Sequence, residues 1–392
     1  MTASKPKAQA RKMSTWEKNL LGVPINDVPK LIPGLVVASL LAWLSIWLSK
    51  FIGVNILGFS KTPISAVTLA ILFGIIIAAI IPMPVMLKPG LSFTVKKVLR
   101  FGIILLGIRL SIFEVFKLGF AGIPIVIICI IAALFITTRI NKWLNLPERL
   151  GALIAVGTSI CGVSAIVATS PAIEAEEEET AYAVAVITIF GLMATIVYPY
   201  LANVIFGGNA LNAGLFFGTA IHDTSQVVGA AKVYSDIYNA PLALDAATVT
   251  KLVRNVFMAF VIPFMAYYYA RNMKDSDGSK KRSTNIFKLL PLFILGFLGM
   301  AVIRSIGDAA IDANRLAFGI WDAQTWSDIV TFIVKWAGNL LVVALAGVGL
   351  STKISTFKGL GFKPFLVGFS AALAVGVVSF ITITLLGGYV TF

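Results

Sequence analysis

Residues 211–231 read LNAGLFFGTAIHDTSQVVGAA, an apolar segment interrupted by the consecutive polar residues His222, Asp223, Thr224, Ser225 and Gln226. A run of polar side chains is expensive in hydrocarbon, so inside a membrane it marks a functional site by default. A solvent-exposed loop is the alternative reading, but the apolar flanks between Leu215 and Ala231 disfavour it. We therefore expect a membrane segment whose helix is broken near its middle.

A second segment has the same character. Residues 157–168 read GTSICGVSAIVA and resemble GTAIHDTSQVVG at 218–229. Closely spaced small and hydroxyl residues weaken a helix, although they also allow helices to pack closely. Transporters place unwound turns of this kind around a substrate cavity. The half-helix after each break offers free N–H groups and a positive dipole end, which suit an anion.

The sequence leaves the course of these two segments open. As simple spans the two units are parallel, whereas as re-entrant hairpins they are inverted. The choice also decides which side carries the acidic run 174–179, which we interpret as a solvated loop. A separate self-match aligns 105–124 with 345–364 without a gap, in spans of opposite expected direction. Inverted repeats of this kind are typical of secondary transporters.

The whole chain has the composition of a membrane protein. Of its 392 residues 58% are hydrophobic and 13% are charged, against about 25% charged in a soluble domain. We predict an all-α polytopic protein with about eleven segments of membrane-spanning character. They are 31–50, 64–81, 98–113, 119–139, 150–170, 180–204, 211–231, 246–270, 287–304, 328–350 and 364–388. Residues 31–392 form one transmembrane domain behind a cytoplasmic segment 1–30, of which 1–13 is interpreted as disordered.

The net charge of +14 is concentrated in short loops on one side of this topology. That asymmetry is an orientation signal, and it places the N-terminus in the cytoplasm and the C-terminus outside a cytoplasmic membrane. It argues against a nucleic-acid partner, and the lipid bilayer is the expected surrounding. Two cysteines and one histidine provide neither a disulfide framework nor a histidine-rich metal site. No phosphate-binding glycine loop or nucleophile elbow is present, so we expect no cofactor and no enzyme activity. A homodimer remains open.

Lys251, Arg254 and Asn255 are spaced to share one face of a helix. Arg254 lies about two turns inside its predicted span, where a charge must face a cavity or a partner. Its guanidinium suits bidentate contact with an oxyanion. A structural ion pair with Asp223 or Asp245, or snorkelling to the interface, is the alternative. Interfacial anchoring accounts for Arg109.

The candidate substrate-binding set combines both polar segments with this helix face. It comprises Thr158, Ser159, Cys161, Gly162, Ser164, Gly218, Thr219, Thr224, Ser225, Gln226, Lys251 and Arg254. His222 and Asp223 are candidates for coupling transport to a proton or sodium, because an unperturbed histidine titrates near neutral pH. A packed, hydrogen-bonding histidine is the alternative reading of His222. Asp223 alternatively caps the half-helix that follows it.

Several of these strings together carry a family resemblance. CGVSAIVATSPAIEAEEEETAYAVAVITIFG (161–191), GTAIHDTSQVVGAA (218–231), KLVRN (251–255) and ALAGVGLST (344–352) resemble the YeiH-type membrane proteins, the family named for sulfate export. The resemblance runs from about residue 30 to the C-terminus. It implies transport of sulfate or a related oxyanion or sulfonate. It also implies a fold related to sodium/proton antiporters and bile-acid symporters, with inverted repeats and broken helices.

These observations favour a secondary transporter that moves a small anion by alternating access, with the anion held between the two polar breaks. A passive anion channel is an alternative that predicts conductance without exchange kinetics. A cation/proton antiporter in which Asp223 binds the ion is the third reading.

Overall fold

The computed structural model describes residues 14, 17, 22–56, 65–272, 292–352 and 362–390. Within these ranges the chain is almost entirely helical, and the one extended contact is a single bridge between Ala317 and Trp321. The predicted all-α class is therefore confirmed. Seven helical stretches of the described chain are long and apolar enough to cross a membrane: Ile25–Lys50, Ile112–Trp143, Glu178–Ile205, Pro241–Met265, Leu292–Asp312, Ala323–Ser351 and Phe362–Tyr389. The count of eleven stays a prediction, and segment 1–13 lies outside the described residues.

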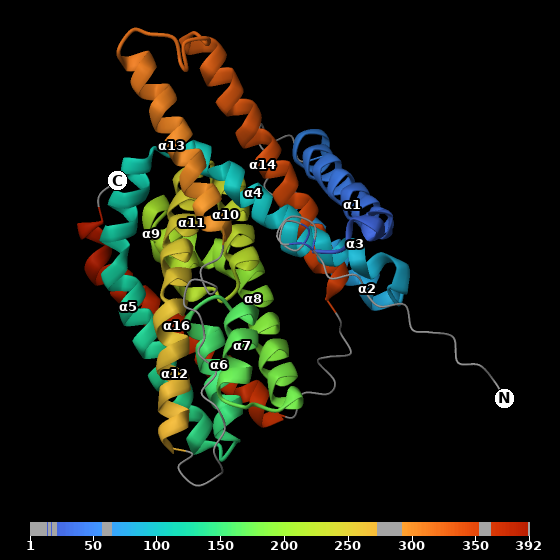
Figure 1. The fold of residues 1–392 in the computed structure, drawn as a ribbon, viewed down its shortest axis with the longest axis vertical. Coiled ribbons are helices and arrows are strands. Elements are labelled where there is room, and N and C mark those ends of the chain that lie inside the picture. The colour runs from blue at the N-terminus through green and yellow to red at the C-terminus, as the bar shows by residue number, and fades with distance from the viewer. Residues whose placement is uncertain are drawn as a thin grey trace, which may run out of the picture.

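The helices form two groups that lie side by side (Figure 1). The panel group consists of α1 (Ile32–Lys50), α2 (Ala66–Ile80), α3 (Lys88–Phe93), α4 (Leu99–Leu106), α13 (Leu292–Asp312) and α14 (Ala323–Ser351). The core group consists of α5 (Ile112–Trp143), α6 (Glu148–Ser159), α7 (Val163–Thr169), α8 (Glu177–Ile205), α9 (Ala210–Ala220), α10 (Thr224–Tyr238), α11 (Pro241–Val256), α12 (Met258–Asn272) and α16 (Phe362–Leu386).

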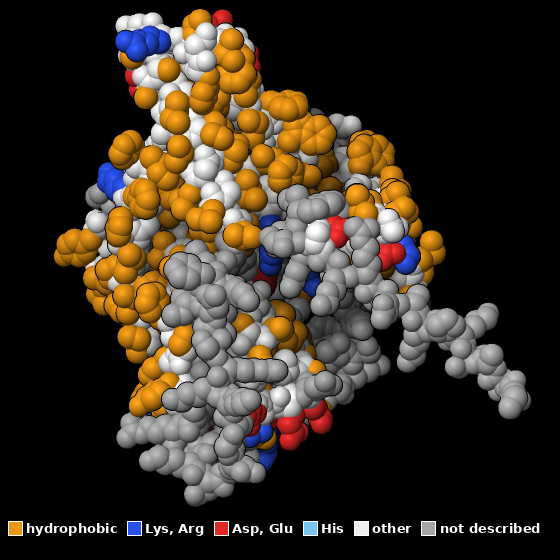
Figure 2. Space-filling view, in the orientation of Figure 1, with side chains coloured by type: hydrophobic (Ala, Val, Ile, Leu, Met, Phe, Trp, Pro, Cys, Tyr) orange, Lys and Arg blue, Asp and Glu red, His pale blue; other side chains and the backbone are white. Residues whose placement is uncertain are grey.

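Large apolar side chains cover much of the outer surface. Trp43 is 65% exposed and Phe113 is 77% exposed, and Figure 2 shows hydrophobic side chains over most of the described surface of one face. Exposed apolar area on this scale marks a surface built for another apolar phase. Lipid is that phase, because a chain with so few charges cannot solvate this area.

The boundary between the third and fourth predicted spans is misplaced in the sequence-based assignment. The predicted span 98–113 begins ten residues earlier, at Lys88, through α3, a π-helical turn (Thr94–Val98) and α4, and it ends at Leu106. The next helix starts at Ile112. Ser111 Oγ accepts from the Glu114 N–H at 3.2 Å, and the Glu114 carboxylate accepts from the Ser111 N–H at 2.6 Å. This capping box fixes the start of α5.

The segment predicted at 150–170 is a hairpin. At its entry, Gly151 of α6 packs against Asn141 near the end of α5, while further along Gly157 packs against Ile166 and Ile187. The Ser170 and Thr180 hydroxyls lie 2.7 Å apart, so α7 runs back alongside the first turns of α8. The chain therefore enters the core group in α6 and returns to the same end in α7.

The segment predicted at 211–231 is a hairpin that enters from the opposite end. Gly214 and Gly218 of α9 pack in the same order against Ala243 and Thr250 of α11, so α9 and α11 are parallel. α10 instead runs parallel to α8. Its start lies near the middle of α8, where Thr195 Oγ1 donates to the Gln226 carbonyl, and Tyr234 reaches Asn203 near the end of α8.

The two polar units are thus inverted hairpins, which resolves the alternative that the sequence left open. It also places the acidic run, at the start of α8, at the same end as the α5–α6 connection; acidic side chains gather at this lower end in Figure 2. For the other self-match, 353–361 of the second copy lies outside the described residues, but the two copies begin in antiparallel helices. α4 and α14 pack in antiparallel directions, since Gly102 lies against Leu341 and Thr94 lies against Gly347.

Candidate functional site

The tips of the two hairpins touch in the middle of the core group. Gly162 has φ +68° and ψ −124°, a conformation that glycine alone adopts readily. A Cβ at Gly162 would lie 3.3 Å from the Asp223 Cα. The turn that breaks the first helix therefore rests directly on the turn that breaks the second.

Arg254 of α11 holds both tips. Its side chain is fully buried. Nε donates to the Ser159 carbonyl at 2.6 Å, and Nη2 donates to the Thr158 carbonyl. Nη1 donates to the carbonyls of Thr219 at 2.6 Å and Ile221 at 3.1 Å. The guanidinium thus bridges the C-terminal ends of α6 and α9.

Lys251, one turn earlier on the same helix face, completes this arrangement. Its buried Nζ donates to the carbonyls of Ile160 at 2.7 Å, Ile221 at 3.1 Å and His222. A helix C-terminus leaves carbonyls without helical partners and carries partial negative charge. Two such ends meet here, and the two cations satisfy their oxygens.

Backbone carbonyls therefore occupy the donors of Arg254, and in this conformation these donors are not free for the predicted oxyanion contact. The alternative ion pair with Asp245 is not formed either, because Asp245 binds Arg109. Arg109 Nε lies 2.7 Å from Asp245 Oδ1, and Nη2 lies 3.0 Å from Oδ2. Arg109 is thus a partner in a largely buried ion pair, and the prediction of an interfacial anchor is wrong.

Asp223 caps α10, as one of its two predicted roles requires. Oδ1 accepts from the Ser225 N–H at 2.8 Å and from Ser225 Oγ at 2.5 Å. Gln226 Oε1 accepts from the Asp223 N–H at 3.2 Å, and Gln226 Nε2 donates to the Thr188 carbonyl. The amides of the first turn of α10 are thereby partly occupied by a carboxylate, which leaves fewer of them for an external anion.

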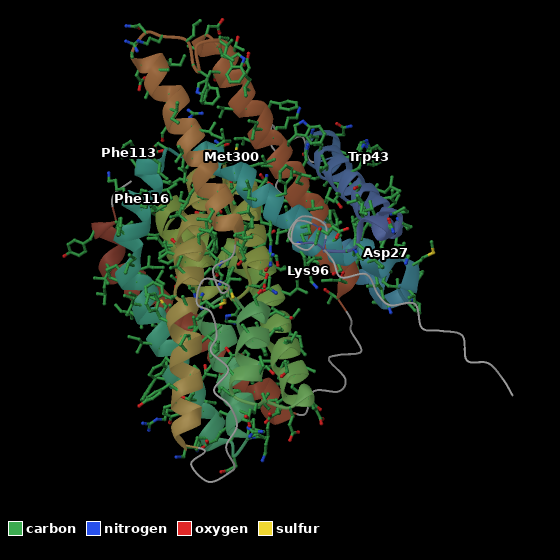
Figure 3. The ribbon with its side chains drawn as sticks, in the orientation of Figure 1. Asp27, Trp43, Lys96, Phe113, Phe116 and Met300 are labelled. Carbon is green, nitrogen blue, oxygen red and sulfur yellow. The ribbon has the colours of Figure 1, made fainter. Side chains whose placement is uncertain are left out.

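A cavity of about 570 Å³ lies between the core and panel groups, beside the hairpin tips. Six of the predicted site residues line it: Cys161, Ser164, Asp223, Thr224, Ser225 and Gln226. The panel group contributes Lys96 and Arg100 from the opposite side. Figure 3 shows Lys96 near the middle of the molecule, between the two groups.

The remaining predicted residues pack behind the tips and do not line this cavity. The Thr158 and Thr219 hydroxyls donate to backbone carbonyls of their own helices. The Thr219 hydroxyl also lies 2.7 Å from the Ser379 hydroxyl of α16. His222 is 2% exposed, and its Nδ1 has no hydrogen-bond partner among the described residues. Gly218 and Ser159 contribute through backbone carbonyls to the Arg254 cluster.

Sequence reasoning missed several polar or charged cavity residues, among them Lys96, Arg100 and Asn255. Lys96 and Arg100 fall in or beside a basic loop of the predicted topology, although their spacing of four residues is the signal of a shared helix face. Asn255 shares the predicted face of Lys251 and Arg254 but is absent from the predicted binding set. It lines the cavity, and its Nδ2 donates to Thr224 Oγ1 at 3.3 Å.

Fold and site together define a helical membrane protein in which two inverted hairpins meet beside a cavity lined by apolar, polar and charged residues. A family model described as "Conserved hypothetical protein 698" matches residues 33–368. A UPF0324 membrane protein of Fusobacterium nucleatum is 33% identical over 79% of this chain and 87% of its own length. Another, from Clostridium tetani, is 33% identical over 90% of this chain and 97% of its own length. The chain belongs to the UPF0324 family of membrane proteins, which is the YeiH family that the motifs indicated. No solved structure matches it.

Proposed function

We propose that the protein is a secondary transporter that moves a small anion, such as sulfate or a sulfonate, across the cytoplasmic membrane by alternating access. The observation that supports this most is the pair of inverted hairpins whose tips meet at the cavity between two helix groups. Discontinuous helices at a repeat interface are the usual substrate sites of secondary transporters. A site between two groups reaches either face of a membrane when one group moves against the other.

The cavity has groups suited to this task. Lys96 and Arg100 supply positive charge, and Ser164 and Thr224 supply hydroxyl donors. Lys251 and Arg254 act one step back, because they hold the hairpin tips in place and neutralise the helix ends behind the site. Asp223 lies within reach of a coupling proton or sodium at the same cavity.

Flux of labelled sulfate into proteoliposomes, with and without a pH gradient, tests the proposal. We expect saturable uptake that external unlabelled anion accelerates by exchange. The Lys96→Gln/Arg100→Gln double variant should lose about tenfold or more in affinity, since it removes both cavity cations. Lys335→Gln, an exposed position on α14 outside the cavity lining, is the matched control. Absence of both sulfate flux and any anion-dependent thermal stabilisation in folded protein would contradict the proposal.

Cation/proton antiport is the second candidate, because the Asp223 carboxyl group lines the cavity. Replacing Arg254 does not separate the two functions, since Arg254 holds the hairpin tips in either case. Asp223→Asn does separate them. It should abolish cation exchange driven by a pH gradient, whereas an anion carrier should retain anion binding.

A further inference from the structure

The two walls of the cavity differ in chemistry. The core wall presents the Asp223 carboxylate and the Asn255 amide, and the panel wall presents Lys96 and Arg100. Apolar side chains such as Ile187, Met258 and Val348 lie among them. A lone inorganic anion accounts for the panel wall only, because at the core wall it would meet a carboxylate.

Asn255 contributes a second polar side chain to the core wall. The residue is 2% exposed, and its Oδ1 has no hydrogen-bond partner among the described residues. Buried acceptors are normally satisfied, and each exception calls for an explanation. The neighbouring Asp223 Oδ1 receives two bonds from Ser225, both from within its own cap. The Asp223 carboxylate is therefore the group of this wall that suits a donating ligand, while the Ser164 and Thr224 hydroxyls can donate or accept beside it.

The panel wall has the opposite character. Lys96 and Arg100 are exposed toward the space between the groups, and neither forms an ion pair within the described chain. The Arg100 guanidinium carbon lies 5.7 Å above the centre of the Phe293 ring, which fixes its position. Two cations spaced four residues apart on one helical stretch suit an acid group of two or three oxygens.

The cavity is also larger than an inorganic oxyanion requires. Its volume of about 570 Å³ falls within the range of roughly 300–1,000 Å³ typical of sites for small organic molecules. A ligand that touches both walls must carry a polar group at each end of an apolar body that spans the cavity.

We propose that the transported anion is a small organic acid that also carries an amino group. Its sulfonate or carboxylate binds Lys96 and Arg100. Its ammonium donates to the Asp223 carboxylate, beside Asn255. This inference rests on the proposed function, and it narrows the substrate of the same site.

Matched ligand pairs test it on the full-length protein in detergent. The pairs are 2-aminoethanesulfonate with ethanesulfonate, and 3-aminopropanoate with propanoate, with sulfate as reference. We expect each amino acid of a pair to bind about tenfold or more tightly than its partner, measured by calorimetry and by thermal shift. Asp223→Asn, which keeps a good N-cap residue, should remove this preference, so that both members of each pair bind equally. Lys96→Gln should weaken both members of each pair, and Lys335→Gln should weaken neither.

The comparison within each pair uses the unaltered protein, so it holds even if a variant fails to fold. Equal binding of both members overturns the amino-group inference and leaves the anion transporter standing. The amino-group inference is also overturned if sodium raises the affinity for ethanesulfonate and the amino compounds bind no more tightly than their partners. The core wall would then hold a sodium ion in place of an ammonium group. If sulfate and all four probes fail to bind, and sulfate flux is absent, the proposed function itself fails.

Discussion

At the scale of residues, the sequence indicates where chemistry lies more reliably than it indicates each residue's role. The polar string 222–226 and the small-residue string around Gly162 do form the two breaks. Arg254 lies at the predicted depth, but its donors bind backbone carbonyls. A guanidinium donates to carbonyl oxygens as well as to oxyanion oxygens, so residue type alone cannot separate the two roles. The orientation of the two helix ends, which depends on packing, decides which kind of oxygen Arg254 binds.

The carbonyl-binding role gives a prediction for Arg254 and Lys251. Arg254→Lys should destabilise the ligand-free protein by about 1–3 kcal/mol for each carbonyl left unsatisfied, because a shorter ammonium with three donors cannot replace the planar guanidinium. That guanidinium binds the carbonyls of Thr158, Ser159, Thr219 and Ile221. Lys251→Met should act in the same direction, since it leaves three carbonyls without their donor. Thermal unfolding in detergent without added anion measures both effects.

Exposed Lys335→Gln serves as the control and should stay within about 0.5 kcal/mol. A residue that only binds substrate would leave the stability of the ligand-free protein unchanged. An Arg254→Lys protein that is as stable as the parent but binds no anion would therefore return Arg254 to the substrate-binding role.

At the scale of elements, the helix breaks were predictable and the hairpins were not. α6 has 12 residues and α9 has 11, about 18 and 17 Å at 1.5 Å per residue. Each is about half a membrane thickness, which fits both a half-span that continues and one that turns back. The deciding contacts are tertiary: Ser170 with Thr180 for the first hairpin, and Gln226 with Thr195 for the second. Nothing in the composition of either string specifies them.

The contact between the hairpin tips gives a prediction for Gly162. Gly162→Ala should cost about 1–3 kcal/mol from backbone strain at its positive φ, with a further loss because the new methyl group presses on Asp223. It should also weaken anion binding, since Asp223 lines the cavity. Thermal unfolding with and without 2-aminoethanesulfonate reports both effects.

Gly207→Ala is the matched control. Gly207 also has positive φ, +57°, but a Cβ added there would meet no atom within 4 Å. It should lose some stability and keep its ligand response. If both variants lose the same stability and the same ligand response, the contact between the hairpin tips contributes to neither.

At the scale of the whole molecule, the two groups are joined by polar contacts at one end, and the central cavity lies between them further along. Arg109 and Asp245 connect the end of the panel helix α4 to α11, and Ser65 at the start of α2 binds Asp236 near the end of α10 at 3.1 Å. A second cavity of about 820 Å³ adjoins the central one within the panel group, beside Lys88 and the end of α2. The two cavities share Val95, Lys96, Ser351 and Thr352. The Arg109–Asp245 and Ser65–Asp236 contacts join residues more than 130 positions apart, so no local pattern in the sequence predicts them.

This asymmetry gives a prediction about access. In a Cys129→Ser/Cys161→Ser background, Ser164→Cys places a thiol on the cavity wall, at an exposed position. A membrane-impermeant thiol reagent should label it faster from the side of the α2–α3 connection, which we expect to be cytoplasmic. Arg109→Gln should raise labelling from the opposite side by about tenfold, because loss of a largely buried ion pair worth about 1.4 kcal/mol or more shifts a two-state equilibrium by that factor.

Arg304→Gln is the control for this experiment, since it breaks an ion pair with Asp308 within the single helix α13 and joins no two groups. It should leave both labelling rates unchanged. Equal labelling from both sides in the unaltered background would indicate a continuous pore and favour the channel. If Arg109→Gln also leaves the opposite side protected, then the ion pair does not close that end, and the closed state must rest on the apolar packing between α4, α5 and α13. The carrier mechanism requires that at least one of these contacts opens when the other end closes, because a cavity reaching both faces at once cannot couple one flux to another.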